Sequence, residues 1–170
     1  MILASVRSTG TRFFTEIFRN AGIPCYKKEQ ITRQGTWLDK GLHVSHCEPM
    51  HMYHLITKVR DYPLFLPMRH PKRVAESWIK RGWAIDSMFF AEWYNLFWLH
   101  EKYDGHWLPI DTPDRDERLY EAGKIAGVEL TTDWQPYEAT ETDFKPRGMT
   151  VDEAMKVLSV MPFNGSYYEL

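Results

Sequence analysis

The chain has 170 residues, of which 44% are hydrophobic and 15% aromatic, and its formal net charge at pH 7 is −2. This length predicts one domain with a full hydrophobic core, and the small negative charge offers no general attraction to nucleic acid or to an anionic membrane. No run of about 18 apolar residues occurs, so we expect no membrane span, and two cysteines with a strand starting at residue 2 favour a cytoplasmic protein without a signal peptide.

Hydrophobic periodicity and turn residues predict strands and helices that alternate along the chain. The predicted elements are a strand at 2–6, a helix at 11–21, an extended segment near 23–27, a strand at 42–46, a helix at 49–58, a strand at 63–68, helices at 71–82 and 86–103, a strand at 107–110 and a helix at 114–126. Alternation of this kind predicts an α/β fold, a three-layer P-loop-like domain over residues 1–170 with a mainly parallel central sheet flanked by helices. Ligands of such sheets bind beyond the carboxyl ends of the strands.

The tail from about residue 131 to 170 has a less regular pattern. In it, Thr150 and Glu153 have the spacing of a capping box, which predicts a last helix. We expect this tail to belong to the same domain, and it is a candidate to close over a bound cofactor.

The turn after the first strand has the composition of a phosphate-binding loop. Residues 7–12 read R-S-T-G-T-R and lead directly into the predicted helix. Backbone N–H groups in such a turn can surround an oxyanion at the positive end of the helix dipole. The Walker A sequence G-x-x-x-x-G-K-S/T is absent, so an ordinary Ser/Thr-capped helix remains an alternative interpretation of this segment.

A second anion site is predicted where the strand at 63–68 meets the helix at 71–82. Arg69 ends the strand, Pro71 suits a first helical position, and Ser77 falls two turns along on the polar face of the helix. Helical N–H groups, the helix dipole and fixed positive charge would therefore act on one spot.

These two segments resemble the nucleotide-binding motifs of the PAPS-dependent sulfotransferases. V-R-S-T-G-T-R-F-F (6–14) resembles the family's 5′-phosphosulfate loop, P-K/R-S-G-T-T/S, with Thr9 interrupting the usual S-G. M-R-H-P-K-R-V-A-E-S-W (68–78) resembles the 3′-phosphate motif, in which an Arg and a Ser stand eight residues apart, here Arg69 and Ser77. The resemblance implies a sulfotransferase that moves a sulfuryl group from PAPS (3′-phosphoadenosine 5′-phosphosulfate) to a hydroxyl or amine acceptor and releases PAP. It also implies that no metal is needed.

The resemblance assigns cofactor binding to both motifs and to a late loop. The residues implied are Arg7, Ser8, Thr9, Gly10, Thr11 and Arg12 for the 5′ end, and Arg69 and Ser77 for the 3′-phosphate. Arg12 stands where the family often carries a Trp stacked on adenine, so Arg12 or the neighbouring Phe13 could stack there, or they could be a surface Arg and a core Phe. F-K-P-R-G-M (144–149) resembles the family's late R-K-G loop, which would add Arg147 and Gly148, unless it is an ordinary loop before a capped helix.

A histidine between the two motifs is the candidate general base. In the family, a strand ending in a K-T-H-like tripeptide carries the base, and Val44-Ser45-His46 occupies that place here, 23 residues before Arg69, without the Lys. The acceptor must lose a proton as it attacks sulfur, and a His with a pKa near neutrality suits that task. Arg7 and the loop amides would stabilise the charge on the leaving 5′-phosphate. A structural, hydrogen-bonded role for His46 is one alternative, and His43 is the second candidate for the base.

Other interpretations stay open. Histidines and a cysteine crowd into residues 43–54 and suggest zinc, although their spacing matches no zinc site that we recognise. A P-loop nucleotide kinase or NTPase is a second alternative, and a non-catalytic nucleotide-binding protein with degenerate loops is a third. The aromatic residues at 83–98 suit a core-facing helix, and some could line a pocket for a small-molecule or carbohydrate acceptor. The sequence indicates no oligomeric state.

Overall fold

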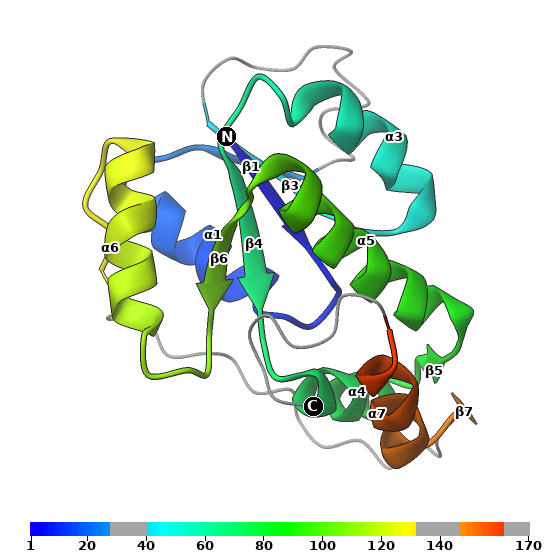
Figure 1. Ribbon diagram of the computed structural model, residues 1–170. Coiled ribbons are helices and arrows are strands. Elements are labelled where there is room, and N and C mark those ends of the chain that lie inside the picture. The colour runs from blue at the N-terminus through cyan, green and yellow to red at the C-terminus, as the bar shows by residue number, and fades with distance from the viewer. Residues whose placement is uncertain (28–40, 132–146, 162–170) are drawn as a thin grey trace.

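A computed structural model describes residues 1–27, 41–131 and 147–161 of the chain. Its central feature is a five-stranded sheet in the order β2-β3-β1-β4-β6, and every pair of neighbouring strands is parallel (Figure 1). The strands are β1 (Ile2–Ser5), β2 (Cys25–Lys27), β3 (Leu42–His46), β4 (Leu64–Met68) and β6 (His106–Pro109). The predicted parallel α/β sheet is therefore confirmed.

Six helices flank this sheet in the described part of the chain. They are α1 (Thr11–Asn20), α3 (Pro49–Lys58), α4 (Pro71–Lys80), α5 (Ser87–Tyr103), α6 (Arg115–Ala126) and α7 (Val151–Ser159). Helices α1 and α6 cover one face, α3 and α5 cover the other, and α4 packs with α7 near the carboxyl ends of the strands (Figure 1). The result is the predicted three-layer arrangement, and each predicted helix is present with ends close to those expected.

Side-chain alternation along the strands divides the core between the two faces. On β1, Leu3 belongs to the cluster with α1 and α6, whereas Ile2 and Ala4 belong to the cluster with α3, α4, α5 and α7. All five residues of β4 are buried, as expected for an interior parallel strand covered on both sides. On α5, Phe89 and Trp93 are fully buried, so this aromatic helix faces mainly the core.

Local signals in the sequence explain where several helices begin. Pro49 and Pro71 occupy first-turn positions of α3 and α4, where a missing N–H costs nothing. The Asp86 carboxylate caps α5 by accepting a hydrogen bond from the Met88 N–H over 2.9 Å. The predicted capping box is present at α7, where Thr150 and Glu153 each accept a hydrogen bond from the other's backbone N–H.

A second, small sheet joins β5 (Ala84–Ile85) to β7 (Arg147–Gly148) in parallel. This pairing attaches part of the C-terminal tail to the segment that follows α4. Residues 132–146 and 162–170, which belong to the tail predicted to close over a cofactor, lie outside the described residues.

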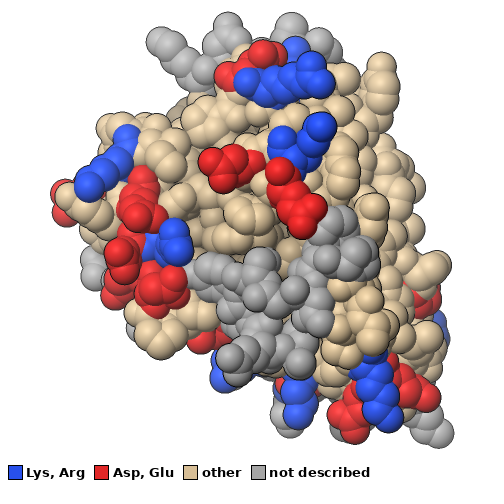
Figure 2. All heavy atoms as spheres, in the orientation of Figure 1, with Lys and Arg blue, Asp and Glu red and all other residues tan. Residues whose placement is uncertain are grey.

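Charges on the surface are mixed in sign. Figure 2 shows Lys and Arg interspersed with Asp and Glu on one face, with a group of both signs over α6 at its edge. In α6, Arg118 lies 3.3 Å from both Asp114 and Glu121. None of the described helices has the length and apolar character needed to cross a bilayer.

Candidate functional site

The parallel sheet brings the ends of β1, β3 and β4 to one edge of the molecule. Ser5 of β1 pairs with His46 of β3 in the strand register. Leu3 of β1 pairs with Phe65 of β4, and Arg7 and Arg69 each stand four residues beyond that pair. The candidate base and the two anion motifs therefore lie at the same edge of the sheet. This is the edge, beyond the carboxyl ends of the strands, at which α/β domains bind their ligands.

The loop after β1 has an unusual backbone conformation. Ser8 and Gly10 both have left-handed conformations, with φ values of 72° and 93°, and Thr9 between them is fully buried. The Thr9 hydroxyl donates to the Val6 carbonyl over 2.8 Å, so its side chain closes the loop and leaves the outer face to backbone groups. The Thr9 N–H is donated to the same carbonyl over 3.3 Å, so N–H groups for an anion would come from Ser8, Gly10 and the first turn of α1.

Gly10 is fixed at its position by space as well as by conformation. A Cβ atom there would lie 2.8 Å from the Ile110 Cδ1 atom, which is closer than real Cβ atoms approach another heavy atom. The left-handed φ angle also disfavours any residue with a side chain. Gly10 therefore sets both the shape of the loop and its close approach to the end of β6.

Each anion motif contains a buried donor that has no hydrogen-bond partner among the described residues. These donors are the Ser8 hydroxyl in the loop and the Arg69 Nε at the end of β4. An unpaired buried donor costs about 1–3 kcal/mol, so native proteins keep few of them. The Trp93 Nε1, in the core, is another such donor, but the two in the motifs stand at the sheet edge where α/β domains bind ligands. There they fit residues that bind a group from outside the protein, such as the oxygens of an anion.

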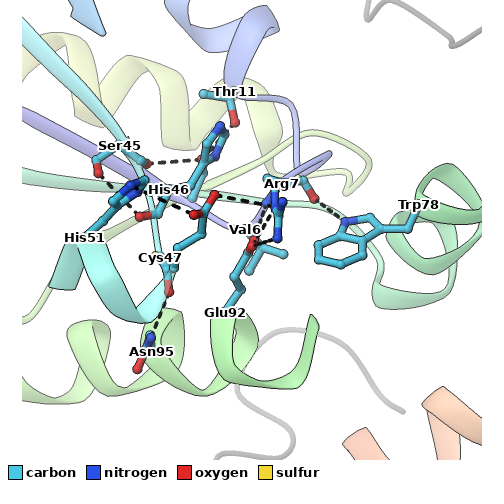
Figure 3. Close-up of polar contacts among 12 residues, drawn as sticks. Val6, Arg7, Thr11, Ser45, His46, Cys47, His51, Trp78, Glu92 and Asn95 are labelled. Carbon is cyan, nitrogen blue, oxygen red and sulfur yellow. Dashed lines mark hydrogen bonds and ion pairs between the residues drawn. The ribbon is translucent and has the colours of Figure 1, made fainter. Parts of the chain in front are cut away.

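Arg7 is held by a carboxylate that sequence reasoning missed. The Glu92 side chain, fully buried on α5, accepts hydrogen bonds from the Arg7 backbone N–H over 2.8 Å and from its Nε over 2.6 Å (Figure 3). The Arg7 guanidinium also lies 4.6 Å from the Trp78 ring centre and 5.3 Å from that of Trp83. Burial raises the pKa of Glu92, and the hydrogen bonds and charge of Arg7 oppose that rise.

The sequence does contain a signal for Glu92. It falls on the same helical stripe as Phe89, Trp93 and Leu96, all of which are fully buried, and a carboxylate on such a stripe needs a partner. One turn later, the Asn95 side chain donates to the Cys47 carbonyl over 2.8 Å (Figure 3). Helix α5 thus fixes the backbone just beyond β1 and just beyond β3.

His46 is the first link of a short chain of hydrogen bonds. Its Nδ1 lies 3.2 Å from the Ser5 hydroxyl, which in turn lies 2.8 Å from the Thr11 hydroxyl at the start of α1. Burial lowers the pKa of His46, and the nearby Glu48 carboxylate partly offsets that effect. At neutral pH the imidazole is therefore mainly uncharged and able to accept a proton.

The second motif is held in place by the end of β6. Both carboxylate oxygens of Asp111 accept the His70 N–H over 3.2 Å, and the His70 side chain caps α4 by accepting the Lys72 N–H over 3.2 Å. Ser77 is 92% buried within α4. The next residue, Trp78, donates from its indole Nε1 to the Arg7 carbonyl over 3.0 Å, which ties the second motif directly to the first.

The remaining predicted site residues lie in different surroundings. Arg147 and Gly148 form β7, and a Cβ atom on Gly148 would clash with the Ile85 carbonyl oxygen, so the small sheet requires this glycine. Arg12 is exposed, whereas Phe13 is only 3% exposed and belongs to the core beside Phe14. Phe13 is therefore a core residue, and its ring does not offer a platform for adenine.

The histidine-rich segment forms no metal-binding group among the described residues. His43 is 2% exposed and stacks on the Tyr26 ring, whereas His46 contacts Ser5. Within residues 1–27, 41–131 and 147–161, no group of three or more His, Cys, Asp or Glu side chains could hold a metal ion.

Comparisons of the chain with protein-family models, with curated proteins and with solved structures found no match.

Proposed function

We propose that this protein is a sulfotransferase that transfers a sulfuryl group from PAPS to a hydroxyl or amine acceptor and releases PAP. The observation that carries the proposal is the hydrogen bond from Trp78 to the Arg7 carbonyl. This bond joins the two anion motifs. Their first charged residues, Arg7 and Arg69, are 62 positions apart in the sequence. Two anion-binding elements on adjacent strand ends suit a nucleotide with a phosphate at each end of its ribose.

The 3′-phosphate would be bound by the second motif. Arg69 supplies a charged donor whose buried Nε has no partner among the described residues, and Ser77 lies on the helix that begins just beyond it. A charge-assisted hydrogen bond to a phosphate is about twice as strong as a neutral one. ATP has no 3′-phosphate, so these residues would favour PAPS and PAP over ATP.

The 5′ end would be bound by the backbone of the loop. Ser8, Gly10 and the first turn of α1 provide N–H groups, and the Ser8 hydroxyl provides a further donor. Glu92 already balances the charge of Arg7 at this loop. A loop with balanced charge suits a phosphosulfate, which carries fewer negative charges than a triphosphate, and the lysine that P-loop kinases use is absent from it.

His46 would act as the general base. The acceptor oxygen or nitrogen attacks sulfur, its proton passes to His46, and the bond between sulfur and the 5′-phosphate oxygen breaks. The electron pair of that bond stays on the phosphate, where the loop N–H groups stabilise the new charge. The sulfuryl group carries less charge than a phosphoryl group, so positioning and these donors can support the transfer without a metal.

Transfer of labelled sulfate from PAPS to a panel of sugars, phenols, alcohols and amines tests the proposal. We expect one class of acceptor to become labelled as PAP is released. His46→Ala should slow the transfer by about a hundredfold or more while leaving PAP affinity nearly unchanged. PAP binding without transfer to any acceptor would instead indicate a non-catalytic nucleotide-binding protein, and full turnover by His46→Ala would exclude His46 as the base.

A further inference from the structure

Ser5 connects the candidate base to the anion loop. It is fully buried at the end of β1, and its hydroxyl lies 3.2 Å from His46 Nδ1, 2.8 Å from the Thr11 hydroxyl and 3.5 Å from the Ser45 carbonyl. In Figure 3, His46 and Ser45 of β3 and Thr11 at the start of α1 mark the surroundings of this path. The three groups therefore form a continuous path from the imidazole to the first residue of the helix that follows the loop.

The number of protons on this path limits how it can be arranged. A serine hydroxyl has one proton to donate and lone pairs to accept with. If Ser5 donates to Thr11, it must accept from His46, so the ring proton is on Nδ1 and Nε2 keeps its lone pair. If Thr11 donates to Ser5 instead, Ser5 can donate to Nδ1, and the ring proton is then on Nε2. Ser5 could also donate to the Ser45 carbonyl, but that contact is 3.5 Å long, at the limit of a hydrogen bond, so the shorter contacts to Thr11 and His46 dominate. Of the two arrangements that these shorter contacts allow, only the first leaves Nε2 able to accept a proton.

The Thr11 hydroxyl decides between these arrangements. Thr11 follows Gly10 directly and opens α1, so its hydroxyl belongs to the loop as well as to the path. An anion bound in the loop offers only acceptor atoms. A Thr11 hydroxyl that donates to the anion can no longer donate to Ser5 and must accept from it.

We propose that Ser5 and Thr11 form a two-hydroxyl relay through which an anion bound in the loop fixes His46 as its Nδ1–H tautomer, with Nε2 as the proton acceptor. The proposal rests on the proposed function, because the anion is the 5′-phosphosulfate of PAPS. Ser5 is thus a positioning residue that acts through His46. The base would become competent when the cofactor is bound, and the imidazolium formed after proton transfer would keep its Nδ1–H bond to Ser5.

Other charged groups around His46 act on its charge rather than on its tautomer. Glu48 favours the protonated ring, as does a hydrogen bond with the Ser5 backbone, whereas Arg7 and His51 disfavour it. The Glu48 carboxylate lies 3.8 Å from Arg7 and 3.9 Å from His51, so all three belong to one local network. A readout of tautomer in the neutral ring is therefore needed to separate the relay from these electrostatic effects.

Nitrogen chemical shifts of the His46 ring in the full chain, at a pH where it is neutral, provide that readout. We expect saturating PAP, and separately inorganic sulfate, to raise the ratio of Nδ1–H to Nε2–H tautomer by about fivefold, the equivalent of one neutral hydrogen bond. Thr11→Val should bind the anion more weakly and, once saturated, show no change of ratio. Thr11→Ser keeps the hydroxyl and should restore the change. Ser5→Ala should also abolish it.

The outcomes separate the relay from the proposed function. If PAP does not bind, the proposed function fails, and the sulfate arm still decides the relay. If either anion binds to the wild-type protein and the ring stays in the Nε2–H form, or if saturated Thr11→Val responds like the wild type, the relay is overturned. If neither anion changes the ratio at any concentration, the relay is overturned as well.

Discussion

The Glu92 carboxylate binds both the backbone and the side chain of Arg7, through contacts of 2.8 Å to its N–H and 2.6 Å to its Nε. A single buried side chain from α5 thereby fixes the first residue of the anion loop. This contact also places an acidic group next to the positive charge that the sequence suggested for the 5′ end of the nucleotide. In the proposed site, the loop would therefore attract an anion through its backbone N–H groups more than through Arg7.

Removing the Glu92 charge should destabilise the fold. Glu92→Gln leaves the Arg7 guanidinium without its buried partner, and breaking one side of a buried ion pair costs about 3 kcal/mol. Chemical denaturation followed by circular dichroism measures the free energy of unfolding. Glu76→Gln, at an exposed position of α4, is the matched control and should change it by less than about 0.5 kcal/mol. Equal values for the two variants would show that the Glu92–Arg7 contact contributes nothing.

Gly10→Ala should damage the loop more than an equivalent change elsewhere. Both Gly10 and Gly22 have left-handed φ angles, of 93° and 80°, but only at Gly10 would a Cβ atom meet a neighbour, Ile110 Cδ1 at 2.8 Å. Gly22→Ala should cost only the conformational strain of about 1 kcal/mol. Thermal unfolding and PAP titration of both variants test this. A Gly10→Ala protein as stable as Gly22→Ala, with normal PAP binding, would contradict the account of the loop.

Arg69→Met should weaken PAP binding without lowering the stability of the fold. The Arg69 guanidinium would lose a charge-assisted contact to the 3′-phosphate worth about 1.5–3 kcal/mol, which weakens PAP by roughly tenfold to a hundredfold. The same change removes a buried unpaired Nε, so the free energy of unfolding should stay the same or rise. Arg60→Met, at an exposed position just beyond α3, is the control. Normal PAP affinity in Arg69→Met would remove Arg69 from the site.

The acid limb of the pH profile should lie below the ordinary pKa of histidine, about 6.5. Burial lowers the pKa of His46, so the ring stays neutral and competent as the pH falls through that value. Glu48 raises the pKa, so Glu48→Gln should move the limb to still lower pH. The dependence of kcat/KM on pH reports this ionisation in the free enzyme. An acid limb with its midpoint above pH 6.5, or a midpoint that moves to higher pH in Glu48→Gln, would be inconsistent with His46 as the base.

The sequence predicted the elements and the sheet because their signals are local. Apolar periodicity, Pro71 at a first helical position and the Thr150 capping box each act within a few residues. The contacts of Glu92 with Arg7 and of Ser5 with His46 join residues 85 and 41 positions apart, so no window of sequence contains them. Their only local trace is a polar residue on an apolar stripe or strand. Phe13 illustrates the converse, because the family resemblance left open a contact with adenine or a place in the core, and the structure places it in the core.

Calorimetric titration with PAP and with ATP·Mg tests the central claim most directly, because the two nucleotides differ in the 3′-phosphate that Arg69 and Ser77 are proposed to bind. We expect PAP to bind at least about tenfold more tightly, a difference of about 1.4 kcal/mol. ATP·Mg binding as tightly as PAP, or more tightly, would contradict the assignment of a PAPS site and favour a kinase or NTPase.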